Sequence, residues 1–266
     1  MSYMSTAIHP HINPVDILGV QYDNLLRSEV LDCIEVWISQ KQAHQICTPN
    51  VAHLLLARKD PEFQSILERA DLVVADGMGV VCAGRFLGTP LKENVGGRLL
   101  LPEFAARAVQ KGYRIFLLGG KNCDVTQKAS ARLCADYPGL CIAGTYTPPF
   151  MHEFDDVENQ RMVDVVNQSK SDVLFVCLGT PKQEKWIARN LQKLNVPVSI
   201  GVGAALDMIA GEVYEPPRWI SGIGFEWLVK LIQEPKRLWR RYLVGVPLFL
   251  GLVLLQRLRL IGASSK

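Results

Sequence analysis

Polar and small residues gather where apolar, β-branched runs of the sequence end. Asp76 follows the run LVVA and precedes Gly77 and Gly79, and the pair Thr48 and Asn50 follows the run QIC in the same way. A carboxylate at such a point can accept a proton from a hydroxyl group, and a neighbouring amide and hydroxyl can orient it. An aspartate before a helix is also a good N-cap, so capping is the alternative role for Asp76.

Three further run ends carry residues of the kind that bind nucleotides. Small residues let a ligand approach the backbone, and free N–H groups at helix starts favour phosphate. Beside Gly77 and Gly79 we expect substrate contacts from Gly119, Gly120, Gly179, Thr180, Gln183, Gly201, Gly203 and Asp207. Lys182 and Glu184 fit either a solvated first helical turn or ligand contact. His44 and His53 have no partner at metal-ligand spacing, so we expect neither ligation nor catalysis from them.

The elements that must position these residues alternate along the chain. Apolar runs closed by Gly, Pro, Asn or Asp predict strands at 45–48, 72–75, 114–118, 141–145, 173–178 and 198–202. Helical patterns occupy 51–57 continuing through 61–69, 98–111, 123–137, 157–168 and 181–193. This alternation predicts an α/β fold with a Rossmann-like, mainly parallel sheet and helices on both faces. Ligands of such sheets bind at the carboxyl ends of the strands.

Composition narrows the class of protein. A chain of 266 residues with 48% hydrophobic residues can bury one sizeable core. Seven cysteines without a C-x-x-C pair argue against a disulfide framework or a zinc site, and we expect buried, reduced thiols. The first residues lack the basic stretch and apolar run of a signal peptide.

The glycine-rich segments exclude several nucleotide chemistries. The segments 77–84 and 201–207 lack the third glycine of G-x-G-x-x-G, and neither a Walker A loop nor a G-x-S-x-G elbow occurs. A sugar-nucleotide transferase fits better, because it needs a diphosphate cradle and one base for the acceptor hydroxyl. No D-x-D occurs, so we expect no metal and no cofactor. A non-catalytic nucleotide-sugar-binding regulator and, less favoured, a nicotinamide-dependent oxidoreductase are the alternatives.

The C-terminal segment has a different surface from the rest of the chain. From Lys230 to Lys266 it holds eight Lys or Arg against one acid, and its 13-residue apolar run at 243–255 contains Pro247. That run is shorter than the about 20 residues that a spanning helix needs. We therefore expect a catalytic domain at 1–222 and a basic amphipathic appendage at 223–266 that lies on an anionic membrane surface. Packing on the body or on another subunit is the alternative.

Several blocks of the sequence, in order, resemble the TagA/WecG/CpsF family of bacterial glycosyltransferases. They read CTPNVAHL, ADLVVADGMGVV, GYRIFLLGG, GTPKQEKWI, GVGAALDMIAGEV and FEWLVKLIQEPKRLWRRYL, within residues 15 to 245. The resemblance implies an inverting transferase that moves N-acetylmannosamine, its uronic acid or glucose from a UDP-sugar to a polyprenyl-diphosphate-linked sugar. Its products would be exopolysaccharide, capsule, teichoic acid or common antigen. It also implies a peripheral position on the cytoplasmic face of the bacterial inner membrane, with no nucleic-acid partner and with a homo-oligomer left open.

The resemblance assigns roles by position. Asp76 matches the proposed catalytic base, Thr48 and Asn50 the polar pair beside it, and Gln183 a donor-pocket glutamine. Asn94 stands where many members have an arginine. If that arginine steadies the diphosphate or the acceptor, its task here is either lost or taken by Arg98, and we expect both Asn94 and Arg98 beside the substrate. We also expect one basic residue of the appendage to close over the site and contact the diphosphate, the candidates being Arg237, Arg240 and Arg241.

Overall fold

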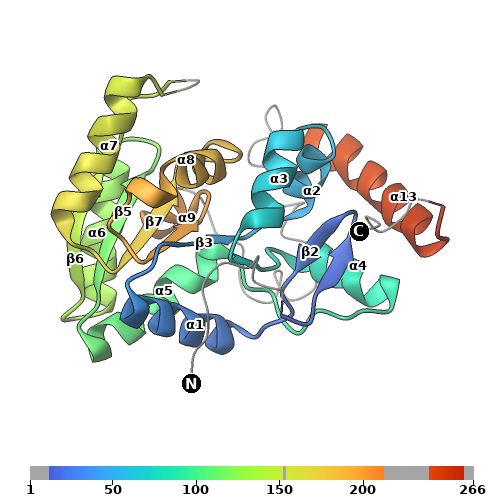
Figure 1. The fold of residues 1–266 in the computed structure, drawn as a ribbon, viewed down its shortest axis with the longest axis horizontal. Helices are drawn as coiled ribbons and strands as arrows, with labels where there is room; N and C mark the ends of the chain where they lie inside the picture. The colour runs from blue at the N-terminus through green and yellow to red at the C-terminus, as the bar shows by residue number, and fades with distance from the viewer. Residues whose placement is uncertain (1–11, 152–153, 213–239, 261–266) are drawn as a thin grey trace.

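The computed structural model describes residues 12–151, 154–212 and 240–260. Its centre is a six-stranded sheet with parallel pairings throughout, in the order β4-β3-β8-β7-β5-β6 (Figure 1). The strands are β3 (His44–Cys47), β4 (Leu72–Val73), β5 (Arg114–Gly119), β6 (Cys141–Tyr146), β7 (Val173–Cys177) and β8 (Val198–Gly201). Because all six run in one direction, their carboxyl ends share one edge of the sheet, where ligands bind in folds of this kind.

Helices cover both faces of the sheet, as Figure 1 shows. Alternate side chains of a strand point to opposite faces. Accordingly, Ile115 and Leu117 of β5 join one buried cluster, whereas Phe116 and Leu118 join another. The first cluster includes residues of α1 (Arg27–Gln40), α5 (Gly97–Lys111), α6 (Cys123–Asp136) and α9 (Ala205–Ile209), and the second includes residues of α7 (Asp156–Ser169) and α8 (Lys182–Asn190).

A third buried cluster lies beside β4. It joins the antiparallel hairpin of β1 (Val15–Ile17) and β2 (Val20–Tyr22) to α2 (Val51–Ala57), α3 (Pro61–Arg69), α4 (Met78–Leu87) and α13 (Val246–Arg257). The helices α2 and α3 begin at polar caps, since Asn50 accepts a hydrogen bond from the Ala52 N–H and Asp60 from the Phe63 N–H. This cluster fixes the helices that surround Asp76.

The predicted α/β fold is confirmed. Each of the six predicted strands has an observed counterpart that begins or ends within two residues of it. The last predicted helix is shorter than expected, because α8 ends at Asn190 and a 3₁₀ turn, η1 (Leu191–Lys193), follows. The short hairpin β1–β2 and the helices α1, α4 and α9 lie outside the predicted elements.

The cysteines differ in part from expectation. All seven are free, in agreement with the absence of a disulfide framework. The prediction that they are buried is wrong for most of them, because they occupy solvent-facing positions of helices and of the edge strand β6. Only Cys47 and Cys177 are buried, whereas Cys82, Cys123, Cys134 and Cys141 are exposed.

The C-terminal helix α13 packs on the body along one side. Phe249 and Val253 are buried in the third cluster, and the Gln256 amide donates to the Asp16 carboxylate at 2.8 Å. A π-helical turn, η2 (Arg240–Gly245), precedes α13. No helix in the described ranges is long and apolar enough to cross a membrane. The proposed domain boundary at 222/223 and Arg237 lie outside the described residues, and for Arg240 and Arg241 only the backbone is described.

Candidate active site

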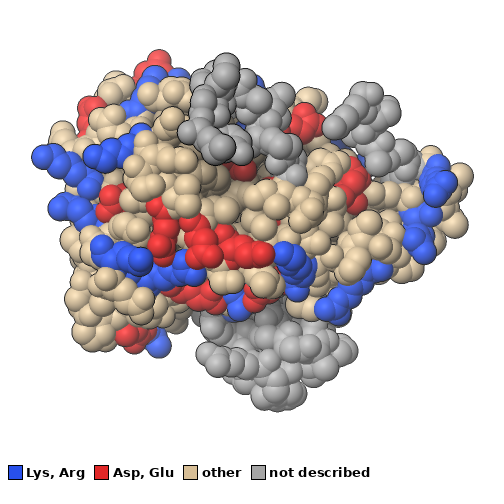
Figure 2. Space-filling model, turned by 60° about the horizontal axis from the view of Figure 1, so that its bottom comes forward, with Lys and Arg blue, Asp and Glu red and all other residues tan. Residues whose placement is uncertain are grey.

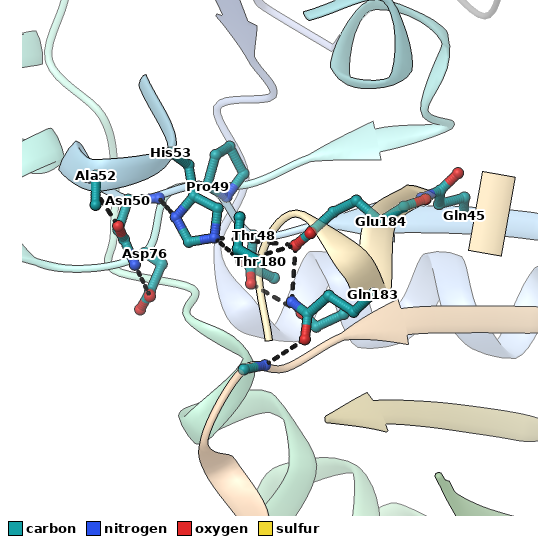
Figure 3. A network of polar contacts seen from close by, with 12 residues as sticks. Gln45, Thr48, Pro49, Asn50, Ala52, His53, Asp76, Thr180, Gln183 and Glu184 are labelled. Carbon is teal, nitrogen blue, oxygen red and sulfur yellow. Dashed lines mark hydrogen bonds and ion pairs between the residues drawn. The ribbon is translucent and has the colours of Figure 1, made fainter. Parts of the chain in front are cut away.

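Asp76 stands at the carboxyl end of β4 and faces α2. Its backbone N–H donates to the Pro49 carbonyl at 3.2 Å, and its carboxylate Oδ2 accepts a hydrogen bond from Asn50 Nδ2 at 3.2 Å (Figure 3). The N-cap of α4 is Gly77, which has a φ of +90°. The capping alternative for Asp76 is therefore wrong, and its half-buried carboxylate is directed by an amide instead.

Asn50 has a fixed orientation. Its Oδ1 accepts from the Ala52 N–H at 3.0 Å as the cap of α2, so the NH₂ end of the amide points to Asp76. Its backbone N–H donates to His53 Nδ1 at 3.0 Å. Beneath this turn the buried Tyr22 hydroxyl donates to the Pro49 carbonyl at 3.1 Å. Burial, and after it the charge of Asp76, holds the pKa of Tyr22 well above its usual range.

The loop from Asn94 to Gly96 leaves room for the Asp76 carboxylate. A Cβ atom added at Gly96 would lie 2.0 Å from Asp76 Oδ1, so only glycine allows the carboxylate its place. Asn94 Oδ1 accepts from the Gly77 N–H at 2.8 Å and from the Gly96 N–H at 3.2 Å. Asn94 thus shapes the loop that holds Asp76. A contact from Asn94 to substrate stays a prediction, as does one from Arg98 in the first turn of α5.

A second part of the site lies at the start of α8. Gln183 is buried, its Oε1 accepts from the Gly203 N–H at 3.1 Å, and its Nε2 donates to Glu184 Oε1 at 2.7 Å. A Cβ atom at Gly201 would lie 2.8 Å from Gln183 Nε2. The Thr48 hydroxyl donates to the Gly201 carbonyl at 3.0 Å, which ties the end of β3 to the end of β8.

Glu184 does not occupy the solvated first turn that is one of the two roles its sequence position suggests, and the other role, ligand contact, stays a prediction. It is 3% exposed, so a solvated first turn is wrong, because the helix presents this position to β3 rather than to solvent. Its Oε1 accepts from Gln183, while its Oε2 is buried without a hydrogen-bond partner among the described residues. Burial raises the pKa of Glu184 to about 7.

His53 lies between the two parts of the site, as Figure 3 shows. Its Nδ1 accepts from the Asn50 N–H, and its Nε2 contacts the Thr180 hydroxyl and lies 3.9 Å from Glu184 Oε1. His53 was expected neither to ligate a metal nor to act in catalysis. Its position three residues after Asn50, at N3 of α2, is a signal that could have indicated the contact to the cap.

Three further predicted residues form a separate group near the end of β5, which lies two strands from β8 in the sheet. Gly119 and Gly120 have φ values of +106° and +94°, and Thr126 donates to the Gly119 carbonyl at 2.6 Å. Asp207 Oδ1 accepts from the Lys121 N–H at 3.0 Å, which connects this turn to α9.

Gly79 and Gly179 lie nearer to Asp76 and Gln183. Gly79 belongs to the part of the site around Asp76, because a Cβ atom there would lie 2.9 Å from the Val51 side chain. Gly179, with a φ of +75°, precedes Thr180.

Comparison with known proteins is consistent with this arrangement. The model of the glycosyl transferase WecG/TagA/CpsF family matches residues 15–262. An N-acetylglucosaminyldiphosphoundecaprenol N-acetyl-β-D-mannosaminyltransferase of Staphylococcus aureus strain MW2 is 30% identical over 238 residues, 89% of this chain and 90% of the relative. The protein of the same name from strain NCTC 8325 has the same identity and coverage. The chain therefore belongs to the WecG/TagA/CpsF family of glycosyltransferases.

Proposed function

We propose that this chain transfers a sugar from a UDP-sugar to a polyprenyl-diphosphate-linked sugar, with inversion at the anomeric carbon. The observation that carries the proposal is the Asp76 corner, where a half-buried carboxylate is held by Asn50 and bordered by Gly77 and Gly96. The name of the Staphylococcus aureus relatives gives an N-acetylglucosaminyl-diphosphoundecaprenol acceptor and an N-acetylmannosaminyl group. Family membership favours a transferase over a nucleotide-binding regulator or an oxidoreductase.

In the proposed reaction Asp76 is the general base. The acceptor hydroxyl bonds to the anomeric carbon while its proton passes to the Asp76 carboxylate. The bond from that carbon to UDP breaks on the opposite face, and UDP leaves with the electron pair. Asn50 donates to one oxygen of the carboxylate, Oδ2, and thereby orients the group for the proton.

The donor is proposed to lie along the ends of β3, β8 and β7. Thr48 and Gln183 hold the Gly201 and Gly203 backbone from the two sides of this stretch. Backbone N–H groups at helix starts and a cation from Arg98 or the basic appendage would stabilise the leaving diphosphate. We propose the donors N-acetylmannosamine, its uronic acid and glucose, each as the UDP derivative.

The decisive assay measures UDP release with these three donors, with and without a short-chain polyprenyl-diphospho-sugar. We expect release that requires the acceptor and strongly favours one donor, with the opposite anomeric configuration in the product. In the described ranges no group of three or more His, Cys, Asp or Glu residues is placed to hold a metal ion. Chelator tests metal independence separately, since loss of turnover in chelator would contradict it. Acceptor-independent release, or none with any donor, would contradict the transferase proposal.

We also propose that the chain lies on the cytoplasmic face of the inner membrane through its C-terminal appendage. The side of α13 that faces away from the body exposes Leu250 and Leu254, and Arg257 and Arg259 follow. Figure 2 shows Lys and Arg side chains at the end of the molecule that carries α13, beside uncharged surface. Apolar side chains next to cations suit an anionic lipid surface.

Vesicle sedimentation tests the membrane position. We expect binding to vesicles that contain anionic lipid and little binding to neutral vesicles. Leu254→Asn should weaken that binding about fivefold without changing the free energy of unfolding, because the side chain is 48% exposed. Equal binding to neutral and anionic vesicles would contradict the electrostatic part of the proposal.

A further inference from the structure

His53 joins the two parts of the candidate site through a chain of directed hydrogen bonds. The Asn50 N–H donates to Nδ1 of the ring at 3.0 Å, so Nδ1 carries no proton. In the neutral imidazole the proton then lies on Nε2, which donates to the Thr180 hydroxyl oxygen. The backbone of α2 thus selects the tautomer that can reach α8.

The chain continues in the same direction beyond the ring. Because Thr180 Oγ1 accepts from His53, its own proton is directed to Glu184 Oε1 at 3.4 Å. Gln183 Nε2 donates to that same oxygen at 2.7 Å. The amide of Gln183 is therefore oriented with its Oε1 toward the Gly203 N–H.

These groups are shielded from solvent. The side chains of His53 and Glu184 are 11% and 3% exposed, and Gln183 is 2% exposed. Burial raises the pKa of Glu184 to about 7, so near neutral pH its protonated form is well populated. Within a low-dielectric interior, directed hydrogen bonds of this kind hold their donors and acceptors in one arrangement.

We propose that His53 is a positioning residue. It couples the Asp76 corner to the buried Gln183 side chain through the relay Asn50–His53–Thr180–Glu184. Its Nδ1 accepts from the Asn50 backbone N–H and so fixes the residue whose side-chain amide orients Asp76. Its Nε2 contacts the Thr180 hydroxyl and so fixes the turn that leads to Gln183. The inference rests on the proposed function, in which Asp76 serves the acceptor and Gln183 borders the donor. One ring thereby aligns acceptor and donor against each other.

Two substitutions separate the two ends of the relay. In His53→Asn the short side chain can still accept from the Asn50 N–H but does not reach Thr180. In His53→Gln the longer amide reaches Thr180 but leaves the position of Nδ1. We expect His53→Asn to raise the donor KM and the Kd for UDP about tenfold with kcat near wild type. We expect His53→Gln to lower kcat about tenfold with the Kd for UDP near wild type.

Thr180 and His44 supply the matched controls. Thr180→Val should reproduce the effect of His53→Asn, and Thr180→Ser should restore wild-type kinetics. The double variant His53→Asn, Thr180→Val should cost no more than the larger single effect, because both remove one shared contact. His44→Asn alters the other histidine in the described ranges, which is buried at the amino end of β3, and should lower Tm while kcat and KM stay as in wild type.

A readout without turnover completes the test. In ¹⁵N-histidine-labelled protein the His53 ring, assigned by its loss in His53→Asn, should show the proton on Nε2 and none on Nδ1 near neutral pH. A proton on Nδ1 would overturn the relay. The relay would also be overturned if both His53 variants changed kcat and KM in the same way and lost as much Tm as His44→Asn does. If wild type transfers no sugar, the proposed function fails, while the tautomer and the UDP affinities still decide the relay.

Discussion

The two ends of the β3–β4 pair carry similar residues in different arrangements. At the amino end His44 Nδ1 lies 2.9 Å from Asp71 Oδ1, and the ring stacks on Trp37 with centroids 4.2 Å apart. At the carboxyl end Asp76 meets an amide, and His53 meets a backbone N–H and a hydroxyl.

The difference lies in what each aspartate holds. Asp71 also accepts from the Gln45 N–H at 2.8 Å, so both of its oxygens fasten one strand to the next. Asp76 has glycines as neighbours instead. Its Oδ1 lies where any side chain at position 96 would clash with it. The Asp71–His44 pair anchors the sheet, whereas Asp76 and His53 belong to the site that we propose binds substrate.

The largest expected effect concerns the buried carboxyl that ends the relay. The pKa of Glu184 is raised to about 7 in the folded chain from 4.5, so its contribution to stability is complete below pH 4.5 and is lost as the pH rises toward 7. A shift of this size corresponds to roughly 3 kcal/mol in the free energy of unfolding. Glu184→Gln removes the ionisation and should flatten this part of the pH dependence.

Urea unfolding at a series of pH values measures this contribution. Glu68→Gln, on the exposed side of α3, is the matched control and should keep the wild-type pH dependence. If the free energy of unfolding of Glu184→Gln falls between pH 4.5 and 7 as steeply as that of wild type, the Glu184 carboxyl is not buried in the folded chain.

The next effect tests the space at the carboxyl end. Gly96→Ala places a methyl carbon 2.0 Å from Asp76 Oδ1 and must displace the carboxylate. A misplaced base should lower kcat about a hundredfold, because proton transfer depends on geometry at the scale of 1 Å. Steady-state kinetics on a water-soluble acceptor measure the loss. Gly251→Ala on α13, where a methyl group meets no neighbour within 4 Å, should leave kcat unchanged.

The amino end should respond in stability alone. Asp71→Ala removes the acceptor of both the His44 ring and the Gln45 N–H and should lower the free energy of unfolding by about 2 kcal/mol. Below the melting temperature kcat and KM should stay within about twofold of wild type, because distant sites act independently. A large loss of kcat in a folded Asp71→Ala protein would break the contrast between the two ends.

The smallest effect concerns Thr48, which ties β3 to β8. Thr48→Val keeps the shape of the side chain but removes the hydrogen bond to the Gly201 carbonyl. We expect a loss of about 1 kcal/mol in stability and about fivefold in kcat/KM. Thr48→Ser should restore both. A Thr48→Val enzyme with unchanged kcat/KM would remove Thr48 from the site and leave it a purely structural contact.

The sequence predicted the sheet and the Asp76 corner because both follow from local signals. Alternating apolar runs marked the strands, and parallel strands bring the residues after them to one edge. Asp76 and Asn50 each follow such a run, so their meeting could be expected. The hairpin β1–β2 was not predicted, because strands of three residues carry too few positions for a periodic pattern.

The relay could not be predicted in the same way. His53 and Thr180 are 127 residues apart, and their contact depends on the place of β8 between β3 and β7 and on the burial of the first turn of α8. Glu184 follows a cis Thr180–Pro181 peptide, in a polar stretch of sequence that suggests solvent. Asn94 was expected beside the substrate, and the hydrogen bond that it accepts from the Gly77 N–H, 17 residues away along the chain, is a tertiary contact that no local pattern marks.

The most direct test of the central claim compares turnover and UDP binding in Asp76→Asn. Asparagine nearly preserves the shape of the side chain but cannot take the proton from the acceptor hydroxyl. We predict that acceptor-dependent UDP release falls about a thousandfold while the Kd for UDP, measured by calorimetry, changes less than about threefold. An Asp76→Asn protein that releases UDP at the wild-type rate would contradict the assignment of Asp76 as the base.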